Sequence, residues 1–308
     1  MERGNGVGKG AEDVLWTNPH IQRGQEDLLF HFGIKFPSEE WQNFFADVRF
    51  VFCGGSSDRM EHLAQEFAKE FSQFAPSDGG AVRNLSTTDR YALYKVGPAM
   101  FVNHGIGIPS LMVVLNETIK LLFHAGCLKH CTFFRVGTSG GLGLEPGTVV
   151  VSRGTLNHQL RQVFTQFVCG EQIDREASLD SRLSAELRAY GEKLDFPVAH
   201  AVTFATDDFY EGQARLDGGF CSIGEEEKMA FLRRLTEEFG VRNIEMESTC
   251  FAAMTKRAGI PAAIVNVTLL NRLLGDQVLA SKETLVDYEA RPFRLLLRFL
   301  RDRLDHKS

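Results

Sequence analysis

The chain has 308 residues, of which 44% are hydrophobic and 24% charged, and its formal net charge is −6 at pH 7. A chain of this length can bury a large core, and the composition is compatible with an ordinary soluble enzyme. The acidic balance and the lack of a dense Lys/Arg tract argue against nucleic acid as a partner.

The N-terminal sequence MERGNGVGKG carries no recognisable targeting signal. It is polar and rich in glycine, and it lacks the apolar stretch of a signal peptide. Gly4 does not occupy the position that myristoylation needs, and no apolar run reaches the roughly 18 residues of a membrane span. We therefore expect a cytoplasmic protein without a membrane contact, with residues 1–17 as a mobile tail and residues 18–308 as a single domain.

Strand-like and helix-like segments alternate along the chain. Strand-like runs fall at residues 48–54, 91–97, 100–105, 131–137, 148–154, 198–204 and 262–270. Helical periodicity marks residues 59–74, 110–126, 178–194, 247–259 and about 284–304, with an expected kink at Pro292. This alternation predicts an α/β protein whose sheet is covered by helices on both faces. The segment 155–178 differs in sequence character from the rest of the chain. Two interpretations of it remain: an active-site lid or plain surface.

Arginines stand beside strand-like runs, and in open α/β sheets ligands bind at the carboxyl ends of the strands. A Gly-rich turn follows residues 48–54 and leads into a helix with Arg59 at its start, where backbone N–H groups favour an anion. Arg135 and Thr138 stand beside a GTSGG turn, and Arg90 opens another strand. A single arginine would most simply form a surface ion pair, but together these groups predict a site for one inorganic phosphate.

The segment FYEGQARLDGG (209–219) predicts a site for a uracil ring. Phe209 offers a flat apolar face, Gln213 carries both a donor and an acceptor, and Arg215 carries only donors. The edge of uracil presents carbonyl acceptors beside an N–H donor, which this set of groups matches.

The segment NIEMES (243–248) predicts a ribose site. Glu245 and Glu247 flank Met246 in the sequence. A carboxylate accepts hydrogen bonds from two neighbouring hydroxyls, and a methionine side chain can pack under the sugar. The alternative for Met246 is ordinary core packing.

Three other motifs are weak. Residues 137–141 match the G-x-S-x-G of serine hydrolases, but no helix follows directly, as a nucleophile elbow requires. Residues 104–109 resemble a dinucleotide loop that lacks its third glycine. A cluster of metal-type ligands lacks the spacing of a zinc site, so buried packing is the favoured interpretation: His124, Cys127, His130 and Cys131. We therefore expect no metal at this cluster.

Several motifs along the chain together point to a known family. In order, they are CGGSSDRM (53–60), TTDRYALYKVG (87–97), HGIGIPS (104–110), FRVGTSGGLGLEPGT (134–148), FYEGQARLDGG (209–219), NIEMES (243–248) and VTLLNR (267–272). They resemble uridine phosphorylase, and its vertebrate-type members more than the bacterial ones. GTSGG and EMES are shared across the nucleoside phosphorylase superfamily, whereas the segment with Gln213 and Arg215 is more specific to the uridine branch.

The resemblance implies a fold and a reaction. The fold is a three-layer α/β/α nucleoside phosphorylase-like fold with a central mixed sheet. The reaction is the reversible phosphorolysis of uridine, and of deoxyuridine, to uracil and (deoxy)ribose 1-phosphate without a cofactor. By similarity, phosphate is held by Gly55, Arg59, Arg135 and Thr138. The ribose is held by Met246 and Glu247, and the base by Phe209, Gln213 and Arg215, with Leu269 and Leu270 as an apolar wall and Glu245 and Arg272 in support.

Two further residues are implied to act across subunits. By similarity, Arg90 reaches the phosphate and His31 reaches the 5′-hydroxyl of the ribose from a partner subunit, which implies a homodimer with shared active sites. From the sequence alone, His31 would be taken for a structural histidine in an apolar setting.

Other functions stay open at this point. Purine-cleaving relatives protonate the base with an aspartic acid, and here Asn271 stands at what looks like the matching position, which disfavours a purine nucleoside phosphorylase or a nucleosidase. A hydrolytic nucleosidase would also not need three phosphate-facing arginines. A catalytically silent nucleoside-binding homologue is the alternative from another functional class.

Overall fold

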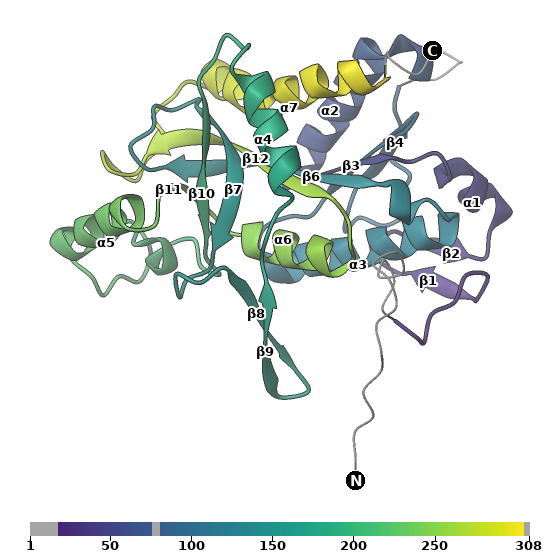
Figure 1. Cartoon of the computed structure of the whole chain (residues 1–308), viewed down its shortest axis with the longest axis horizontal. Coiled ribbons are helices and arrows are strands. Elements are labelled where there is room, and N and C mark those ends of the chain that lie inside the picture. The colour runs from purple at the N-terminus through teal and green to yellow at the C-terminus, as the bar shows by residue number, and fades with distance from the viewer. Residues whose placement is uncertain (1–17, 76–80, 305–308) are drawn as a thin grey trace.

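The computed structural model describes residues 18–75 and 81–304, so the predicted tail at 1–17 lies outside the described residues. An eight-stranded mixed sheet runs through the molecule (Figure 1). Its strands are β3 (Phe50–Gly54), β4 (Leu93–Val96), β5 (Ala99–Asn103), β6 (Thr132–Gly141), β7 (Val149–Leu156), β10 (Val198–Ala205), β11 (Val241–Glu245) and β12 (Ala262–Asn271). They lie side by side in the order β11-β10-β7-β12-β6-β3-β5-β4.

Helices cover both faces of this sheet, as the alternation predicts (Figure 1). One layer contains α1 (Glu39–Phe45), α3 (Ile108–Ala125) and α6 (Ser248–Arg257), and the other contains α2 (Ser57–Glu70), α4 (Ser181–Gly191) and α7 (Lys282–Leu304). Another helix, α5 (Glu225–Glu237), packs beside β11. The predicted three-layer α/β/α fold with a mixed sheet is therefore confirmed.

Alternating side chains on the buried strands build one core on each face. On β3, Val51 and Cys53 belong to the core under α3, whereas Phe52 belongs to the core on the α2 and α7 side. There the ring of Phe52 stacks on Phe101 and Phe134 of the neighbouring strands, with centroids 4.9 and 5.4 Å apart. Because β3 is buried on both faces, its sequence is an unbroken apolar run, and such a run predicts a buried strand.

Helix α3 has the length and composition of a membrane span, contrary to the expectation that no run in the chain reaches that length. Half of its residues are buried, and they pack in the core shared with α1 and α6. The helix begins at Gly107 and ends at Gly126, whose φ of 80° suits a left-handed helix end. Its apolar character is that of a core helix.

The sheet closes on itself at one side, which the sequence did not reveal. Strand β11 pairs with β10 and also, antiparallel, with the end of β6, where Asn243 and Ile244 lie opposite Gly141 and Gly140. Strands β11, β10, β7, β12 and β6 thus form a closed ring. A register shift in β12 leaves Leu269 as an extra residue opposite β6, a bulge of the kind often found beside active sites.

All of the predicted strands and helices are present within a few residues, but some elements were missed. The GTSGG segment is the second half of β6 rather than a turn. Elements not predicted are α1, α5, β11, the pair β1 (Asp27–Leu29) and β2 (Ile34–Phe36), and the pair β8 (Val163–Val168) and β9 (Glu171–Glu176). Strands β8 and β9 lie within the segment 155–178, whose role the sequence did not decide. They form a hairpin that projects from the body of the molecule (Figure 1). Helix α7 continues through Pro292.

Candidate active site

A cavity of about 410 Å³ lies at the carboxyl ends of β3, β6, β11 and β12. It brings together all the predicted site residues except His31 and Arg90: Gly55, Arg59, Arg135, Thr138, Phe209, Gln213, Arg215, Glu245, Met246, Glu247, Leu269, Leu270 and Arg272. These residues come from segments almost 220 positions apart in the sequence, so the fold assembles one site from the separate motifs.

The anion end of the cavity is built around the start of α2. Ser56 caps this helix, its hydroxyl accepting the backbone N–H of Arg59 at 3.3 Å. A side chain at Gly55 would come within 3.2 Å of the carbonyl oxygen of Gly105, so the close approach of these two loops favours glycine. The Arg59 guanidinium pairs with Glu289 of α7, at 3.1 and 3.2 Å. The N-terminus of α2 and Arg59 together form the positive side of the cavity.

Arg135 is buried at the centre of the cavity wall, between two carboxylates. Its Nη2 contacts Glu247 and lies 2.9 Å from Glu245, and its Nη1 donates to the Asn266 side chain at 2.9 Å. Burial raises the pKa of Glu245, whereas Glu247, although also buried, has a lowered pKa because Arg135 lies nearby and the backbone N–H of Gly107 bonds to it. Arg135 therefore balances part of the negative charge of these two groups.

The two glutamates have different local roles. Glu245 accepts the backbone N–H groups of Glu247 and Ser248, at 3.0 and 2.9 Å, and so holds the turn that leads into α6. Glu247 accepts the N–H of Gly107 at 2.6 Å, which links it to the start of α3. This geometry agrees with the prediction that Glu245 supports the turn on which Met246 and Glu247 are displayed.

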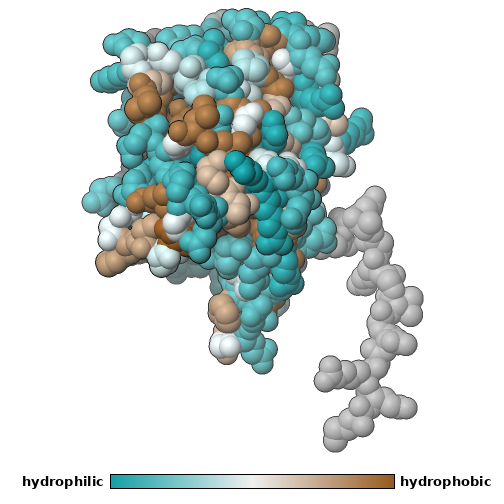
Figure 2. Space-filling model, turned by 90° about the vertical axis from the view of Figure 1, so that its left-hand side faces the viewer, coloured by the Kyte–Doolittle hydropathy of each residue, from teal (hydrophilic) through white to brown (hydrophobic). Residues whose placement is uncertain are grey.

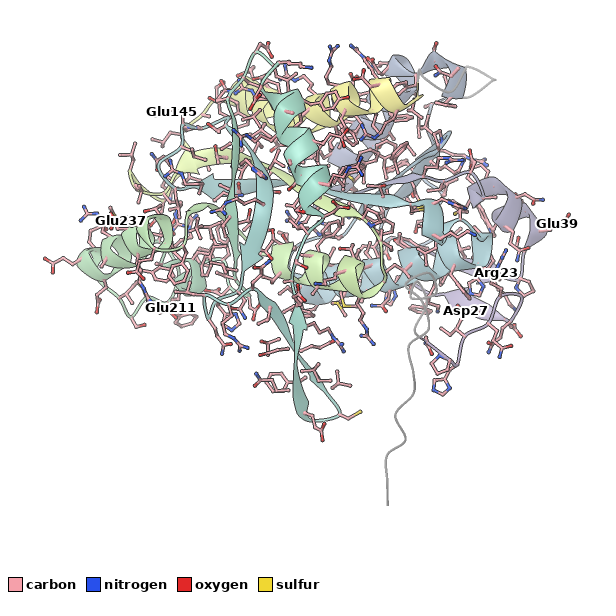
Figure 3. All side chains as sticks on the ribbon, in the orientation of Figure 1. Arg23, Asp27, Glu39, Glu145, Glu211 and Glu237 are labelled. Carbon is pink, nitrogen blue, oxygen red and sulfur yellow. The ribbon has the colours of Figure 1, made fainter. Side chains whose placement is uncertain are left out.

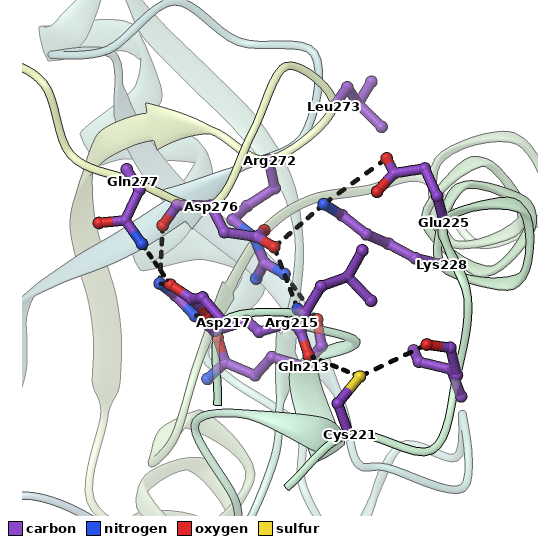
Figure 4. Close-up of polar contacts among 12 residues, drawn as sticks. Gln213, Arg215, Asp217, Cys221, Glu225, Lys228, Arg272, Leu273, Asp276 and Gln277 are labelled. Carbon is purple, nitrogen blue, oxygen red and sulfur yellow. Dashed lines mark hydrogen bonds and ion pairs between the residues drawn. The ribbon is translucent and has the colours of Figure 1, made fainter. Parts of the chain in front are cut away.

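At the base end, the Arg215 guanidinium lies over the ring of Phe209, 4.5 Å from its centroid. Asp217 binds Arg215 through both carboxylate oxygens at 2.9 and 2.7 Å, and the carbonyl of Asp276 accepts from its Nη2 at 2.7 Å (Figure 4). These bonds use Nε and Nη2 and none of them uses Nη1. The Gln213 side chain is buried and lines the same end.

Asp276 clamps the two loops that form the base end (Figure 4). One of its oxygens accepts from Arg272 at 2.8 Å, and the other from Lys228 of α5 at 3.0 Å and from the backbone of Leu216 at 3.2 Å. Arg272 also donates to the carbonyl of Gln213 at 2.8 Å, and its buried Nη1 has no partner among the described residues. That free N–H edge is suited to an acceptor on a bound base.

Sequence reasoning missed the acidic members of this clamp. Asp217 follows Arg215 by two positions, and Asp276 follows Arg272 by four, so the spacing of opposite charges was a usable but weak signal. It also missed His104, which lines the cavity within the HGIG motif, and Gln277, which donates to Asp217 at 2.5 Å.

Asn271 is not among the residues that line the cavity, and the comparison with purine-cleaving relatives at this position stays a prediction. Its side-chain oxygen accepts from the backbone N–H groups of Gly143 and Leu273, at 3.0 and 3.1 Å, and fixes the turn after β12. The neighbouring Leu270 and Arg272 are the residues of this segment that reach the cavity.

His31 and Arg90 lie together outside the cavity. The His31 ring pairs with Glu117 of α3 at 2.7 Å, and the hydroxyl of Thr88 donates to the carbonyl of His31 at 2.5 Å while accepting from the backbone of Arg90 at 3.4 Å. Asp27 lies on β1, four residues before His31, and Glu211 lies in the base-binding loop. The two lie toward opposite ends of the molecule (Figure 3). The chain thus presents the two residues predicted to act in a partner's site on one shared surface.

The weak motifs have structural explanations. Ser139 donates to the carbonyl of Val267 and accepts from Asn243, so its hydroxyl is engaged in the sheet. His124 binds Asp27 at 2.9 Å, and the Cys127 thiol donates to the carbonyl of Phe45. In residues 18–75 and 81–304, no group of three or more potential ligands could hold a metal ion.

The rim of the base end carries exposed apolar side chains. Figure 2 shows apolar areas that interrupt the polar surface on the α5 side of the molecule. In the segments next to the base-binding loops, Phe220, Leu274 and Leu279 are 87, 85 and 91% exposed.

Comparison with known proteins agrees with this geometry. The family model described as the phosphorylase superfamily matches residues 49–301. A uridine and thymidine phosphorylase of Caenorhabditis elegans is 48% identical over 91% of this chain and 92% of its own length. This chain belongs to the uridine phosphorylase family. Uridine phosphorylase 1 of Mus musculus is 44% identical over 94% of this chain and 93% of its own length.

Solved structures of the family share the fold as well as the sequence. A uridine phosphorylase structure from the oomycete Phytophthora capsici matches with a TM-score of 0.89 and 43% identity, over 96% of this chain and 99% of that one. The family also contains a member named as inactive, uridine phosphorylase B of Schistosoma mansoni, which is 36% identical over 92% of this chain and 95% of its own length.

The Asp276 clamp gives a prediction for stability. Asp276→Asn keeps the side-chain shape but removes the charge that faces the buried Arg272 and Lys228, so unfolding free energy should fall by about 1.5–3 kcal/mol. The lowered pKa of Asp276 means that its stabilisation is present above the usual carboxyl pKa and disappears as the pH falls through the pKa in the folded protein. Urea unfolding at neutral and acidic pH should therefore show a difference that shrinks under acid.

The matched control is Asp287→Asn. Asp287 also pairs with two arginines, but on the surface of α7, where such pairs contribute about 0–1 kcal/mol. Equal losses in both variants would contradict a special role for the clamp.

Proposed function

We propose that this chain catalyses the reversible phosphorolysis of uridine, and of deoxyuridine, to uracil and (deoxy)ribose 1-phosphate. The observation that carries the proposal is the cavity itself, which combines an arginine-lined anion end, a Glu-Met-Glu turn and a Phe-Gln-Arg base end within one volume. Membership of the uridine phosphorylase family supports the same reaction.

The reaction breaks the bond between C1′ of the ribose and N1 of uracil. The bonding electrons leave with the base, where Gln213 and Arg215 stabilise the negative charge on the ring and its carbonyls. A phosphate oxygen then forms the new bond to C1′, and the leaving uracil anion takes up a proton. No protein nucleophile is needed, so positioning of phosphate and nucleoside supplies much of the rate.

The charged groups of the cavity suit a reaction in which one end binds phosphate and the other binds the base. Arg59 and Arg135 each have carboxylate partners that fix the direction of the guanidinium before a ligand arrives. An arginine has five N–H donors, so it can bind phosphate while keeping such a partner. Glu247 in its ionised form would accept from the ribose hydroxyls, next to Met246.

We also propose a homodimer in which each cavity is completed by Arg90 and His31 of the partner subunit. Support comes from the shared surface on which these residues lie, where Leu28 and Phe30 beside them are 52 and 69% exposed. Exposed apolar side chains around functional polar ones are typical of a protein–protein contact. We further propose a cytoplasmic location.

Thymidine is a second candidate substrate. The 48% identical nematode relative is named a uridine and thymidine phosphorylase. Thymine adds a methyl group to the uracil ring, and the apolar side chains of Leu269, Leu270 and Val278 line the cavity where such a group could be buried.

The test of the reaction is ultraviolet absorbance of the purified protein with uridine, with and without inorganic phosphate. We expect conversion of uridine to uracil only when phosphate is present, and parallel samples with thymidine and inosine define the base preference. Cleavage without phosphate would indicate a hydrolase, and cleavage of inosine alone would contradict the proposed base site. Uridine binding without turnover would identify a silent homologue.

In the same assay, Arg215→Ala should lower the rate of uridine cleavage by at least about a hundredfold, because it removes the donors that stabilise the leaving base. Arg188→Ala is the control, since Arg188 lies on the surface of α4 and pairs only weakly with Glu192 at 3.5 Å. Near-normal turnover by a folded Arg215→Ala protein would reject its proposed role.

Sharing of the active site predicts complementation between inactive variants. Arg90→Ala and Arg215→Ala chains are co-expressed with different tags, and the mixed dimers contain one intact cavity each. Random pairing should therefore restore about a quarter of the wild-type activity. Co-expression of Arg59→Ala with Arg215→Ala should restore none, because both residues belong to the same subunit's cavity. Equal activity of the two mixtures would contradict sharing through Arg90.

A further inference from the structure

His104 is a buried side chain in the cavity wall, and the proposed reaction gives it no role. It follows β5, and its backbone N–H donates to the carbonyl of Gly54 at 2.8 Å, which anchors it beside the end of β3. The residue is 1% exposed and lines the cavity with Gly55 and Arg59. It therefore lies at the anion end rather than at the base end.

Both ring nitrogens of His104 lack a hydrogen-bond partner among the described residues. A buried polar group without a partner is destabilising, so native proteins rarely retain one without a reason. The adjoining cavity is open, and a ligand bound there could provide the missing partner.

Charged groups from three elements act on the imidazole. Arg135 of β6 and Arg59 of α2 disfavour its protonation, whereas Glu247 at the start of α6 favours it. Burial is the largest influence and, with the arginines, lowers the pKa of His104 to about 4. The ring is therefore neutral at neutral pH, beside two arginines and a carboxylate that already has partners.

We propose that His104 is a binding residue of the anion site, whose ring contacts the incoming phosphate and takes up a proton from solvent as the phosphate enters. This inference rests on the proposed function. A phosphate dianion next to the ring favours the imidazolium form, which has two N–H donors instead of one. Because both ring nitrogens are buried, contact requires a small rotation of the ring or a shift of Arg59.

The direct test uses sulfate, which has the shape and charge of phosphate but does not itself titrate near neutral pH. Calorimetric titrations at about pH 5.5, in buffers with different ionisation enthalpies, measure the protons bound with the anion. We expect wild-type protein to take up protons with sulfate. His104→Asn and His104→Gln should lose this uptake and bind sulfate roughly tenfold more weakly.

His200→Asn is the matched control. His200 lies on β10, away from the cavity lining, and partial burial lowers its pKa as well, so it reports general effects of removing a half-buried histidine. It should keep both the sulfate affinity and the proton uptake. Glu245 and Glu247 are present in every variant. Proton uptake by these two groups would therefore persist in the His104 variants.

Steady-state kinetics separate binding from structural damage. In His104→Asn the KM for phosphate should rise about tenfold while the KM for uridine stays within about twofold, because only the anion end is changed. The Asn side chain can reproduce the position of Nδ1 and the Gln side chain that of Nε2, so the milder variant identifies the nitrogen that contacts the anion. Equal rises in both KM values would indicate a structural role and overturn the proposal.

The two proposals fail in different ways. Unchanged sulfate affinity and proton uptake in both folded His104 variants would overturn the role of His104, even if wild-type protein cleaves uridine. Proton-linked sulfate binding that depends on His104, in a protein that cleaves no nucleoside, would support the anion site and reject the proposed reaction.

Discussion

The antiparallel contact between β6 and β11 determines where the parts of the cavity lie. It joins the end of the strand that carries Arg135 to the end of the strand that leads into Glu245 and Glu247. The glycines that end β6 also allow the end of β12 and Arg272 to pack closely against it. A Cβ atom at Gly140 would lie 2.9 Å from the Arg272 side chain, and one at Gly141 would lie 3.0 Å from the carbonyl oxygen of Leu270. Any side chain there would push β12 away and open the wall of the cavity.

The buried charges follow from this closure. Once Arg135 and the two glutamates share one interior wall, each group offsets the cost of burying the others. Arg135 also bonds to Asn266 of β12, so the charges are tied to the sheet and not to mobile loops. The result is a wall with fixed donors and acceptors, which is the kind of preorganisation that an enzyme of this reaction class requires.

Much of the site could be predicted because its residues occupy short motifs with distinctive chemistry. The anion turn before Arg59 and the Phe-Gln-Arg segment are visible in the sequence, and an alternating pattern of strands and helices indicates at which sheet edge they gather. The clamp around Asp276 could not be predicted in this way, since spacing alone does not reveal that the loops holding Arg215 and Arg272 meet in space. Ring closure was equally hidden, because β11 is only five residues long and includes polar Arg242 and Asn243.

Asn271 shows why the direction of a side chain is hard to predict at a strand end. The bulge at Leu269 interrupts the regular pairing of β12, so the simple alternation of side chains does not continue across it. Asn271 consequently binds the backbone of the next turn, and its neighbours on either side line the cavity. His104 could not be predicted for a different reason: a histidine in a glycine-rich segment gives no signal in the sequence that its side chain lines a cavity.

The two ends of the cavity are held together by different kinds of contact, and the Asp276 clamp belongs to the base end. The anion end is built from strand ends and helix starts that belong to the two main cores, whereas the base end consists of two loops held to each other and to α5 largely through charge pairs. Separating those loops breaks a few electrostatic contacts and leaves the sheet intact. Loosening the base end therefore costs only these contacts, whereas loosening the anion end would require strands and core helices to separate, so local stability is lower at the base end than at the anion end.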